Sequence, residues 1–395
     1  MSRLFIVAEA SLGYTYTMDH SGDSDSQAEY GSISRRSSYQ YLAGALGNSP
    51  FGVVFVVFAT LAATGYHCAY PPRNHFNRVL PRWQVINLHL PEHPLTSIPS
   101  LDAPLLRSFS LEAIRSKPMR FPFSETPRLT RLTWPFPLDV SANPQIPWCQ
   151  ISRLYIYHGM TYFSVSEVIR SCPKLEDLEM HLFPLSGTAM VVDASRLPCK
   201  SSPSLWRLCT TVPKDGSPFL NSLTLPALKE FRSEMSEEDP LLTTHPVHNA
   251  ILDLLTRSNC KLDRLELDNC GFSPSEIRRC FEHKSLETVE ALRIANLRVQ
   301  FMVNDEVLLC LTILPSSSPS RILLPKLTHL ELGACLGASS GMLGRMIQSR
   351  RFPPGKHGVD QLKFLFVLDQ ELHRADRDLI NNAVLDGLEV RIGRI

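Results

Sequence analysis

The chain has 395 residues, enough for two to four domains of about 100 to 200 residues each or for one elongated repeat domain. Hydrophobic residues make up 44% of it and charged residues 20%, a globular balance that excludes a wholly disordered chain and a polytopic membrane protein. The formal net charge of +1 lacks the basic excess of a dedicated nucleic-acid-binding protein, so we expect no nucleic-acid partner.

The first 72 residues differ in composition from the rest of the chain. Residues 1–40 contain nine serines and little apolar periodicity, which predicts a disordered Ser-rich tail. Residues 41–72 contain no Asp, Glu, Lys or Arg, and their most apolar part, 51–69, approaches the roughly 20 residues that span a bilayer. We consider three interpretations of 51–69: a membrane span, a buried strand or helix, and sequence that does not belong to the folded domain.

From 73 to 395 we predict one domain, because one apolar pattern recurs along it. Hydrophobic residues stand at i, i+3 and i+5, the L-x-x-L-x-L core of a leucine-rich repeat. The copies begin at Leu106, Leu129, Ile151, Leu175, Leu220, Leu262, Val289, Leu327 and Leu362. The first four lie within the period of about 20 to 29 residues of this class, and the later ones are unevenly spaced. Each copy predicts a short strand that points alternate residues into a core.

Helical segments alternate with these strands. Hydrophobic residues at helical spacing predict helices over 164–171, 247–258, 305–314, 341–349 and 371–384. The arginines expected on the solvent side of these helices are Arg170, Arg257, Arg345 and Arg374. We therefore predict an α/β fold, an irregular leucine-rich-repeat solenoid in which short parallel strands alternate with helices, preceded by the disordered tail.

The strand residues between the inward leucines should form a protein-binding surface. Successive side chains of a strand point to opposite faces, so these residues should line the concave face of the repeats. They are Arg131, Arg153, Tyr155, Tyr157, Asp177, Glu179, His181, Arg264, Glu266, Asp268, Arg293, His329 and Glu331. Tyrosine and arginine on neighbouring strands are the composition of an interaction hot spot. Phe364 and Phe366 should also face outward, covered by the last helix or the C-terminus.

No motif indicates a metal or a cofactor. The cysteines form no C-x-x-C pair and the chain contains no N-x-[ST] sequon, so we expect reduced thiols in a cytoplasmic or nuclear protein, with membrane association as the alternative. The H-x-x-E-H match at 89–93 needs a helix that Pro91 and Pro94 disrupt. We therefore expect neither a metal nor a cofactor.

One motif points to catalysis. Residues 337–341 match G-x-S-x-G between a predicted strand and a predicted helix, the setting of a nucleophile elbow. A serine hydrolase would use Ser339, Asp360 or Asp369, and His373. The 54 residues after 341 are too few for the rest of such a sheet, so we favour a turn without catalytic function and keep the hydrolase as a weaker alternative.

Several segments are characteristic in combination. They are Arg82–Pro91, Ile151–Ile156, Val165–Leu178, Leu223–Leu228, Leu254–Cys260, Leu327–Leu332, Met346–Arg351 and Gly387–Ile392. Together they resemble the leucine-rich-repeat region of the large F-box protein family of mushroom-forming fungi. The resemblance covers roughly residues 80 to 395 and is one of architecture more than of any invariant motif.

The resemblance implies a function. In that family an F-box precedes the repeats and binds the Skp adaptor of a cullin ubiquitin ligase, while the repeats recruit substrate. It therefore implies a non-catalytic scaffold whose partner is a protein substrate on the repeat face. No F-box pattern precedes Trp83, so we expect the Skp adaptor and cullin as partners only if a cryptic F-box exists. The alternative is a membrane-tethered leucine-rich-repeat binding protein anchored through 51–69.

Overall fold

The computed structural model has an α/β fold with parallel strands. It describes residues 6–8, 54–58, 83–90, 101–113, 121–136, 138–182, 200–213, 216–235, 247–296, 301–314, 322–353, 358–368 and 372–393. The chain divides into two compact units, unit 1 (Met1–Pro135 and Asn143–Pro147) and unit 2 (Phe136–Ala142 and Trp148–Ile395). The domain predicted over 73–395 therefore contains parts of both units.

Most of the first 72 residues lie outside the described part of the chain. The predicted tail, 1–40, contributes only strand β1 (Ile6–Ala8), and the apolar segment 51–69 contributes only strand β2 (Val54–Phe58). These two strands pair in parallel. Where the structure describes the chain, no helix is both long enough and apolar enough to cross a bilayer.

Unit 1 is built from parallel strands around an aromatic core. Its main strands follow chain order as β1, β2, β3 (Val85–Leu90), β5 (Ser108–Ala113) and β7 (Arg131–Trp134), and β4 (Leu101–Asp102) pairs with β6 (Phe123–Glu125). Phe109 contacts Phe123 edge-to-face, with ring centroids 5.1 Å apart, and lies 6.2 Å from Trp134. Such offset and perpendicular contacts add to the stabilisation that burial gives.

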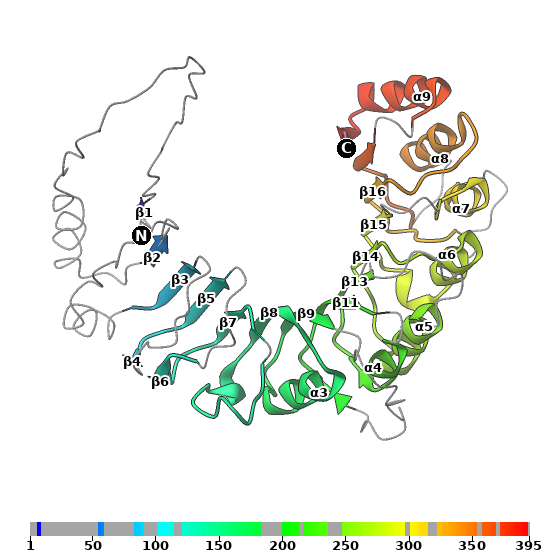
Figure 1. The fold of residues 1–395 in the computed structure, drawn as a ribbon. Coiled ribbons are helices and arrows are strands. Elements are labelled where there is room, and N and C mark those ends of the chain that lie inside the picture. Colours follow the sequence, from blue (N-terminus) through cyan, green and yellow to red (C-terminus); the bar gives the residue numbers. More distant parts are fainter. Residues whose placement is uncertain are drawn as a thin grey trace, which may run out of the picture. The chain divides into compact units, whose positions relative to one another are not determined.

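Unit 2 has a parallel sheet with helices on one side. The strands pair successively in the order β8 (Arg153–Met160), β9 (Asp177–Leu182), β11 (Arg207–Val212), β13 (Glu230–Met235), β14 (Arg264–Asp268), β15 (Ala291–Ala295), β16 (His329–Gly333), β17 (Phe364–Leu368) and β18 (Glu389–Gly393). The helices are η2 (Trp148–Gln150), α3 (Tyr162–Ser171), α4 (Ser217–Asn221), α5 (Val247–Ser258), α6 (Pro274–Phe281), η4 (Lys284–Leu286), α7 (Asp305–Leu311), α8 (Met342–Arg351) and α9 (Arg374–Leu385). Figure 1 shows α3 to α9 on the outer side of this sheet and the strands on the inner side.

The predicted leucine positions form the core of unit 2. Leu154, Leu178, Leu265, Leu330 and Leu365 are fully buried and stand at equivalent positions of their strands. All five predicted helices are present, with ends shifted by a few residues, and the four predicted arginines on them are exposed. The strand and helix periodicities of the sequence therefore identify the buried side of most of the elements that they predict.

One predicted repeat copy is wrong. The copy at Leu220 is not a strand of the main sheet. Leu220 lies in helix α4, and Leu223 lies in β12 (Leu223–Thr224), which pairs only with β10 (Lys200–Ser201) among the described strands. The strands that belong to this stretch are β11 and β13. Their third inward positions hold Thr210 and Ser233 instead of apolar residues, so neither strand matches the pattern.

Helices α3, α6 and α7 begin at a side-chain cap, whereas α4, α8 and α9 have none of their own. Ser273 and Glu276 form a capping box at α6, and Asn304 accepts a hydrogen bond from the amide of Val307 at the start of α7. Helix α8 begins at Gly341, whose φ of 83° is left-handed and which has no side chain to cap with.

The cap of α8 comes from the next helix. Asp376 of α9 is buried, and its two carboxylate oxygens accept from the amides of Gly341 (3.1 Å) and Gly344 (2.8 Å). Gly344 also allows the two helices to pack closely, since a Cβ there would lie 2.6 Å from Cβ of Leu379. One acidic side chain therefore both caps α8 and attaches α9 to it.

A buried arginine connects the same region to the preceding helix. Arg350 of α8 is fully buried and donates to the carbonyls of Leu311 (2.7 Å), Leu323 (2.7 Å) and Leu324 (2.9 Å). These carbonyls belong to the end of α7 and to the turn before β16, and the carbonyl of Leu324 also accepts from the amide of Leu327. Burial lowers the pKa of Arg350 to about 10, so its side chain remains charged at neutral pH.

We predict that Asp376→Ala lowers the free energy of unfolding by about 1–2 kcal/mol, because two buried amides at the start of α8 lose their acceptor. Urea unfolding followed by circular dichroism measures this. The control is Asp378→Ala, since Asp378 is exposed on the same helix and should change stability little. Equal midpoints for the two variants would contradict the capping role.

Candidate protein-binding face

The strand side of unit 2 presents three rows of side chains that cross neighbouring strands in register. The first row is Arg153, Asp177, Arg207, Glu230, Arg264, Ala291, His329, Phe364 and Glu389. The second is Tyr155, Glu179, Cys209, Arg232, Glu266, Arg293, Glu331, Phe366 and Arg391. The third is His181, Thr211, Glu234, Asp268, Ala295 and Gly333.

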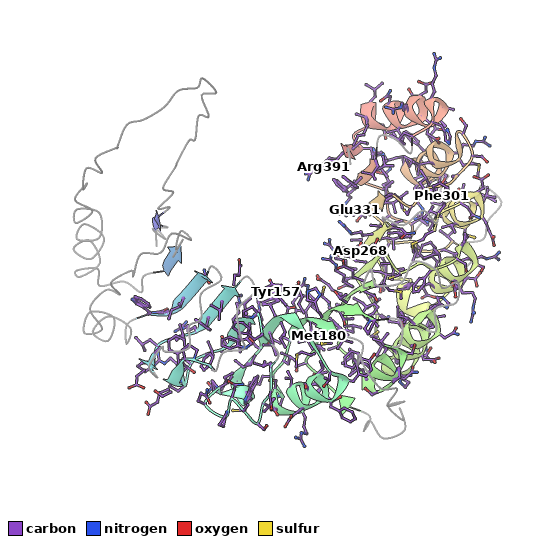
Figure 2. All side chains as sticks on the ribbon, in the orientation of Figure 1. Tyr157, Met180, Asp268, Phe301, Glu331 and Arg391 are labelled. Atoms are coloured by element: carbon purple, nitrogen blue, oxygen red, sulfur yellow. The ribbon has the colours of Figure 1, made fainter. Side chains whose placement is uncertain are left out.

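The structure brings most of the predicted binding residues together in these rows. All the predicted residues except Arg131 and Tyr157 belong to one of them. Tyr157 lies beside the third row, with its ring centroid 6.3 Å from that of His181, and is 49% exposed. Arg131 is exposed on β7 of unit 1. Figure 2 shows Tyr157, Asp268, Glu331 and Arg391 along the strand side of unit 2.

Arg207 is the centre of an ion-pair cluster across β8, β9, β11 and β13. Its guanidinium lies 2.9 Å from Asp177, 3.6 Å from Glu179 and 3.4 Å from Glu230. Asp177 is buried and also accepts a 2.7 Å hydrogen bond from the hydroxyl of Tyr155. Burial opposes the charge of Arg207, but the neighbouring carboxylates outweigh it and raise the pKa of the guanidinium.

Arg232 and Arg293 organise a second cluster around Asp268. Arg232 lies 3.0 Å from Asp268, 3.5 Å from Glu234 and 3.6 Å from Glu266. Arg293 donates to Asp268 (3.0 Å) and to Glu331 (3.1 Å), so it bridges β14 and β16. Burial is again the largest single effect and lowers the pKa of each arginine. The surrounding acidic groups together outweigh it, so both pKa values are raised.

The two aspartates have a different role from the glutamates. Asp177 and Asp268 have side chains only 6% exposed, whereas Glu179 and Glu234 are 25% and 37% exposed. A buried carboxylate needs counter-charges, and removing one partner leaves an uncompensated charge at a cost of about 3–5 kcal/mol. Asp177 and Asp268 therefore hold the arginines in place, and the glutamates and arginines are the groups that a partner can reach.

The β16–β18 end of the face is aromatic. The ring of His329 stacks on Phe364 with centroids 5.8 Å apart, and the guanidinium of Arg391 lies 5.3 Å from the centroid of Phe364. Phe366 contacts Gly393, where a Cβ would lie 2.8 Å from its Cζ. Both phenylalanines are half-buried, so the C-terminal strand β18 partly covers them, as predicted.

The sequence analysis missed Arg207, Glu230, Arg232 and Glu234, which belong to β11 and β13. A signal for these strands was present. Leu205 and Leu208 on β11, and Leu228 and Phe231 on β13, have the i and i+3 spacing and are buried. Only the apolar residue at i+5 is absent, so a pattern that tolerates Thr or Ser at that position would have found both strands.

The hydrogen bonds of Ser339 are those of a structural residue. Its hydroxyl and its amide each donate to Asp305 at 2.6 Å, and these hydrogen bonds lower the pKa of that carboxyl. His373 makes its 3.1 Å hydrogen bond with the carbonyl of Ala338, and Asp360 pairs with Lys326. Asp369, the other acidic residue predicted for a hydrolase, lies outside the described residues, and the contacts of Ser339, His373 and Asp360 do not form the Ser–His–Asp arrangement that a hydrolase requires.

No cation or cofactor chemistry is apparent on the described residues. Among them no three His, Cys, Asp or Glu side chains are grouped so as to hold a metal ion. The described cysteines are free thiols. The chemistry that this face offers is therefore that of charged and aromatic contacts.

Neither a family model nor a curated protein matches this chain.

We predict that iodoacetamide at pH 8 alkylates Cys149 and spares Cys209 in the folded protein. Cys149 is exposed, whereas burial, reinforced by the charge of Glu179, raises the pKa of Cys209 to about 12. The reactive thiolate of Cys209 is therefore scarce at pH 8. Peptide mass spectrometry measures both sites, and alkylation in urea is the control that should label both. Equal labelling rates in the folded protein would show that the centre of the face is open to solvent.

Proposed function

We propose that this chain is an irregular leucine-rich-repeat solenoid that binds a protein partner on the strand face of unit 2 and has no catalytic activity of its own. The observation that carries the proposal is the ordered surface on β8 to β18, where arginine, glutamate and aromatic side chains stand in register on neighbouring strands. Partly exposed arginines and aromatic residues are the groups enriched at interaction hot spots.

Two features support binding over a purely structural role. The arginines are fixed in position by buried aspartates, so a partner would meet a preorganised surface and the entropy lost on binding would be small. The face also combines ion pairs with exposed Tyr157 and with the aromatic group around Phe364. Tyr157 and Phe364 also offer a partner aromatic surface that is still partly exposed.

The resemblance to F-box repeat proteins indicates which kind of partner the face would bind. We propose that the face recruits a protein substrate, as the repeat region of that family does. A link to a ubiquitin ligase would need the Skp adaptor, and no described residue forms an evident adaptor site. Substrate binding and ligase association are therefore separate hypotheses with separate experiments.

We predict that Tyr157→Ala lowers partner recovery about fivefold or more when the full chain is used for affinity capture, because truncation of a hot-spot aromatic residue costs over 1 kcal/mol. The matched control is Phe163→Ala. Phe163 is 56% exposed on helix α3, on the other side of the sheet, and should leave recovery unchanged. Quantitative mass spectrometry compares both variants with the wild type. Equal losses, or none, would contradict binding on the strand face.

The ligase link is tested by the same capture, blotted for the Skp adaptor and for cullin. Recovery of both proteins, unaffected by Tyr157→Ala, would support a cryptic F-box elsewhere in the chain. Recovery of other partners without these two would leave a free-standing binding scaffold.

A further inference from the structure

We propose that the strand face takes a basic segment of the partner, and that a lysine or arginine side chain of this segment docks beside Glu234 and Asp268 on β13 and β14. This inference rests on the proposed function and specifies the chemistry of the partner. It comes from the distribution of charge over the three rows, from the incomplete bonding of Asp268, and from the positions of the arginines around it.

The first two rows are electrically balanced. From β8 to β16 they contain equal numbers of arginines and carboxylates, the arginines being Arg153, Arg207, Arg232, Arg264 and Arg293 and the carboxylates Asp177, Glu179, Glu230, Glu266 and Glu331. Opposite charges alternate along most of both rows, which is the favourable arrangement for cross-strand pairs. These rows have no excess charge to offer a partner.

The third row carries an excess of negative charge. Glu234 and Asp268 are direct neighbours in register, and the row contains no arginine or lysine. Two like charges opposite each other on adjacent strands are destabilising unless a cation lies close to both. The whole chain has a formal charge of only +1, so this acidic pair is a local feature of the face.

The cations already present do not fully satisfy the acidic pair. Arg232 is shared among Glu234, Glu266 and Asp268, and its distances to the two glutamates, 3.5 and 3.6 Å, are long for hydrogen bonds. Arg293 satisfies only Oδ1 of Asp268, because its other bond goes to Glu331.

Asp268 provides an independent observation. Its Oδ2 is buried and makes no hydrogen bond, although Nη2 of Arg232 lies 3.0 Å away, and Nε of Arg232 is also without a hydrogen bond. This oxygen therefore has an ion-pair contact but lacks the added stabilisation of an aligned hydrogen bond. A second cationic donor placed over Glu234 would pair with that glutamate and leave Arg232, in its present position, to Asp268 and Glu266.

The site suits a side chain better than a metal ion or a phosphate. Two carboxylates beside a guanidinium provide too few oxygens for calcium or magnesium, and the negative excess repels phosphate. The next residues of the third row, Ala295 and Gly333, are small and uncharged, so they add no competing cation. A lysine or arginine on an extended segment fits this charge.

The test uses two fluorescein-labelled peptides with the full-length protein. One carries four arginines separated by Gly-Ser, and the other carries glutamates at the same positions. Fluorescence anisotropy at low salt should show binding of the arginine peptide only. Glu234→Gln should weaken that binding about three- to tenfold, the effect of losing one charge–charge contact at an interface.

The matched control is Glu282→Gln on the helix side. Glu282 resembles Glu234 because it is also paired with an arginine, Arg278, and its side chain is 48% exposed against 37%. This variant should bind the arginine peptide like the wild type. A second variant, Ala295→Lys, leaves both acidic groups in place and adds a cation next to Asp268. It should weaken binding as Glu234→Gln does.

The outcomes separate this inference from the proposed function. Equal affinities for Glu234→Gln and Glu282→Gln would mean that any attraction is not at this site, and stronger binding of the glutamate peptide would reverse the charge assignment. Either result overturns the inference. If Tyr157→Ala still reduces partner capture in that case, the protein-binding function stands with a partner of different chemistry. Unchanged melting temperatures of the three variants show that each difference reflects binding.

Discussion

The register between neighbouring parallel strands determines the organisation of unit 2, and it is constant except for one shift between Ile156 and Met160, where β8 pairs with β9. A parallel pair without a slip places equivalent residues side by side, and the two-residue period of a strand then sends alternate residues to opposite faces. In unit 2 this arrangement puts leucines such as Leu178 and Leu265 into one buried layer and groups the polar residues between them into continuous rows. Both the core and the candidate binding face follow from this single constraint.

The same register creates an electrostatic problem, which alternation of charge solves. Charged residues at equivalent positions on adjacent strands lie close together, so a run of one sign along a row would repel itself. The first row avoids this repulsion by alternating Asp177, Arg207, Glu230 and Arg264. The neighbouring strands thereby stabilise each other through their outward side chains as well as their inward ones, and Glu234 beside Asp268 is an exception to the pattern.

Much of this arrangement could be predicted from the sequence, and the reason for the rest is physical. The leucine pattern identifies strands whose inward residues are all apolar, and the alternation then names outward residues such as Glu179 and Glu266 correctly. It fails at β11 and β13 because Thr210 and Ser233 are fully buried although their hydroxyls make no hydrogen bond. Burial of an unbonded hydroxyl is unfavourable, so a pattern made only of apolar residues does not expect it there.

The burial of Asp177 and Asp268 could not be predicted from the sequence, for a different reason. Each aspartate is covered by an arginine from a strand that lies about 25 to 40 residues away along the chain. The exposure of an outward residue depends on such neighbours, and they are known only once the strand order and register are fixed. The sequence therefore indicates which face a residue occupies, and only the fold indicates whether it serves as a support or as a contact.

Arg350 and Asp376 have a consequence for the way this part of the molecule opens. In a stack of similar layers each layer contacts only its neighbours, so the layers at an end can come apart one at a time. Here Arg350 of α8 forms hydrogen bonds with the end of α7 and with the turn before β16, and Asp376 of α9 forms hydrogen bonds with the start of α8. Breaking any one of these layers exposes buried groups in the next. We therefore expect the last three helices to open as one cooperative unit, whose amides share one free energy of opening in hydrogen exchange.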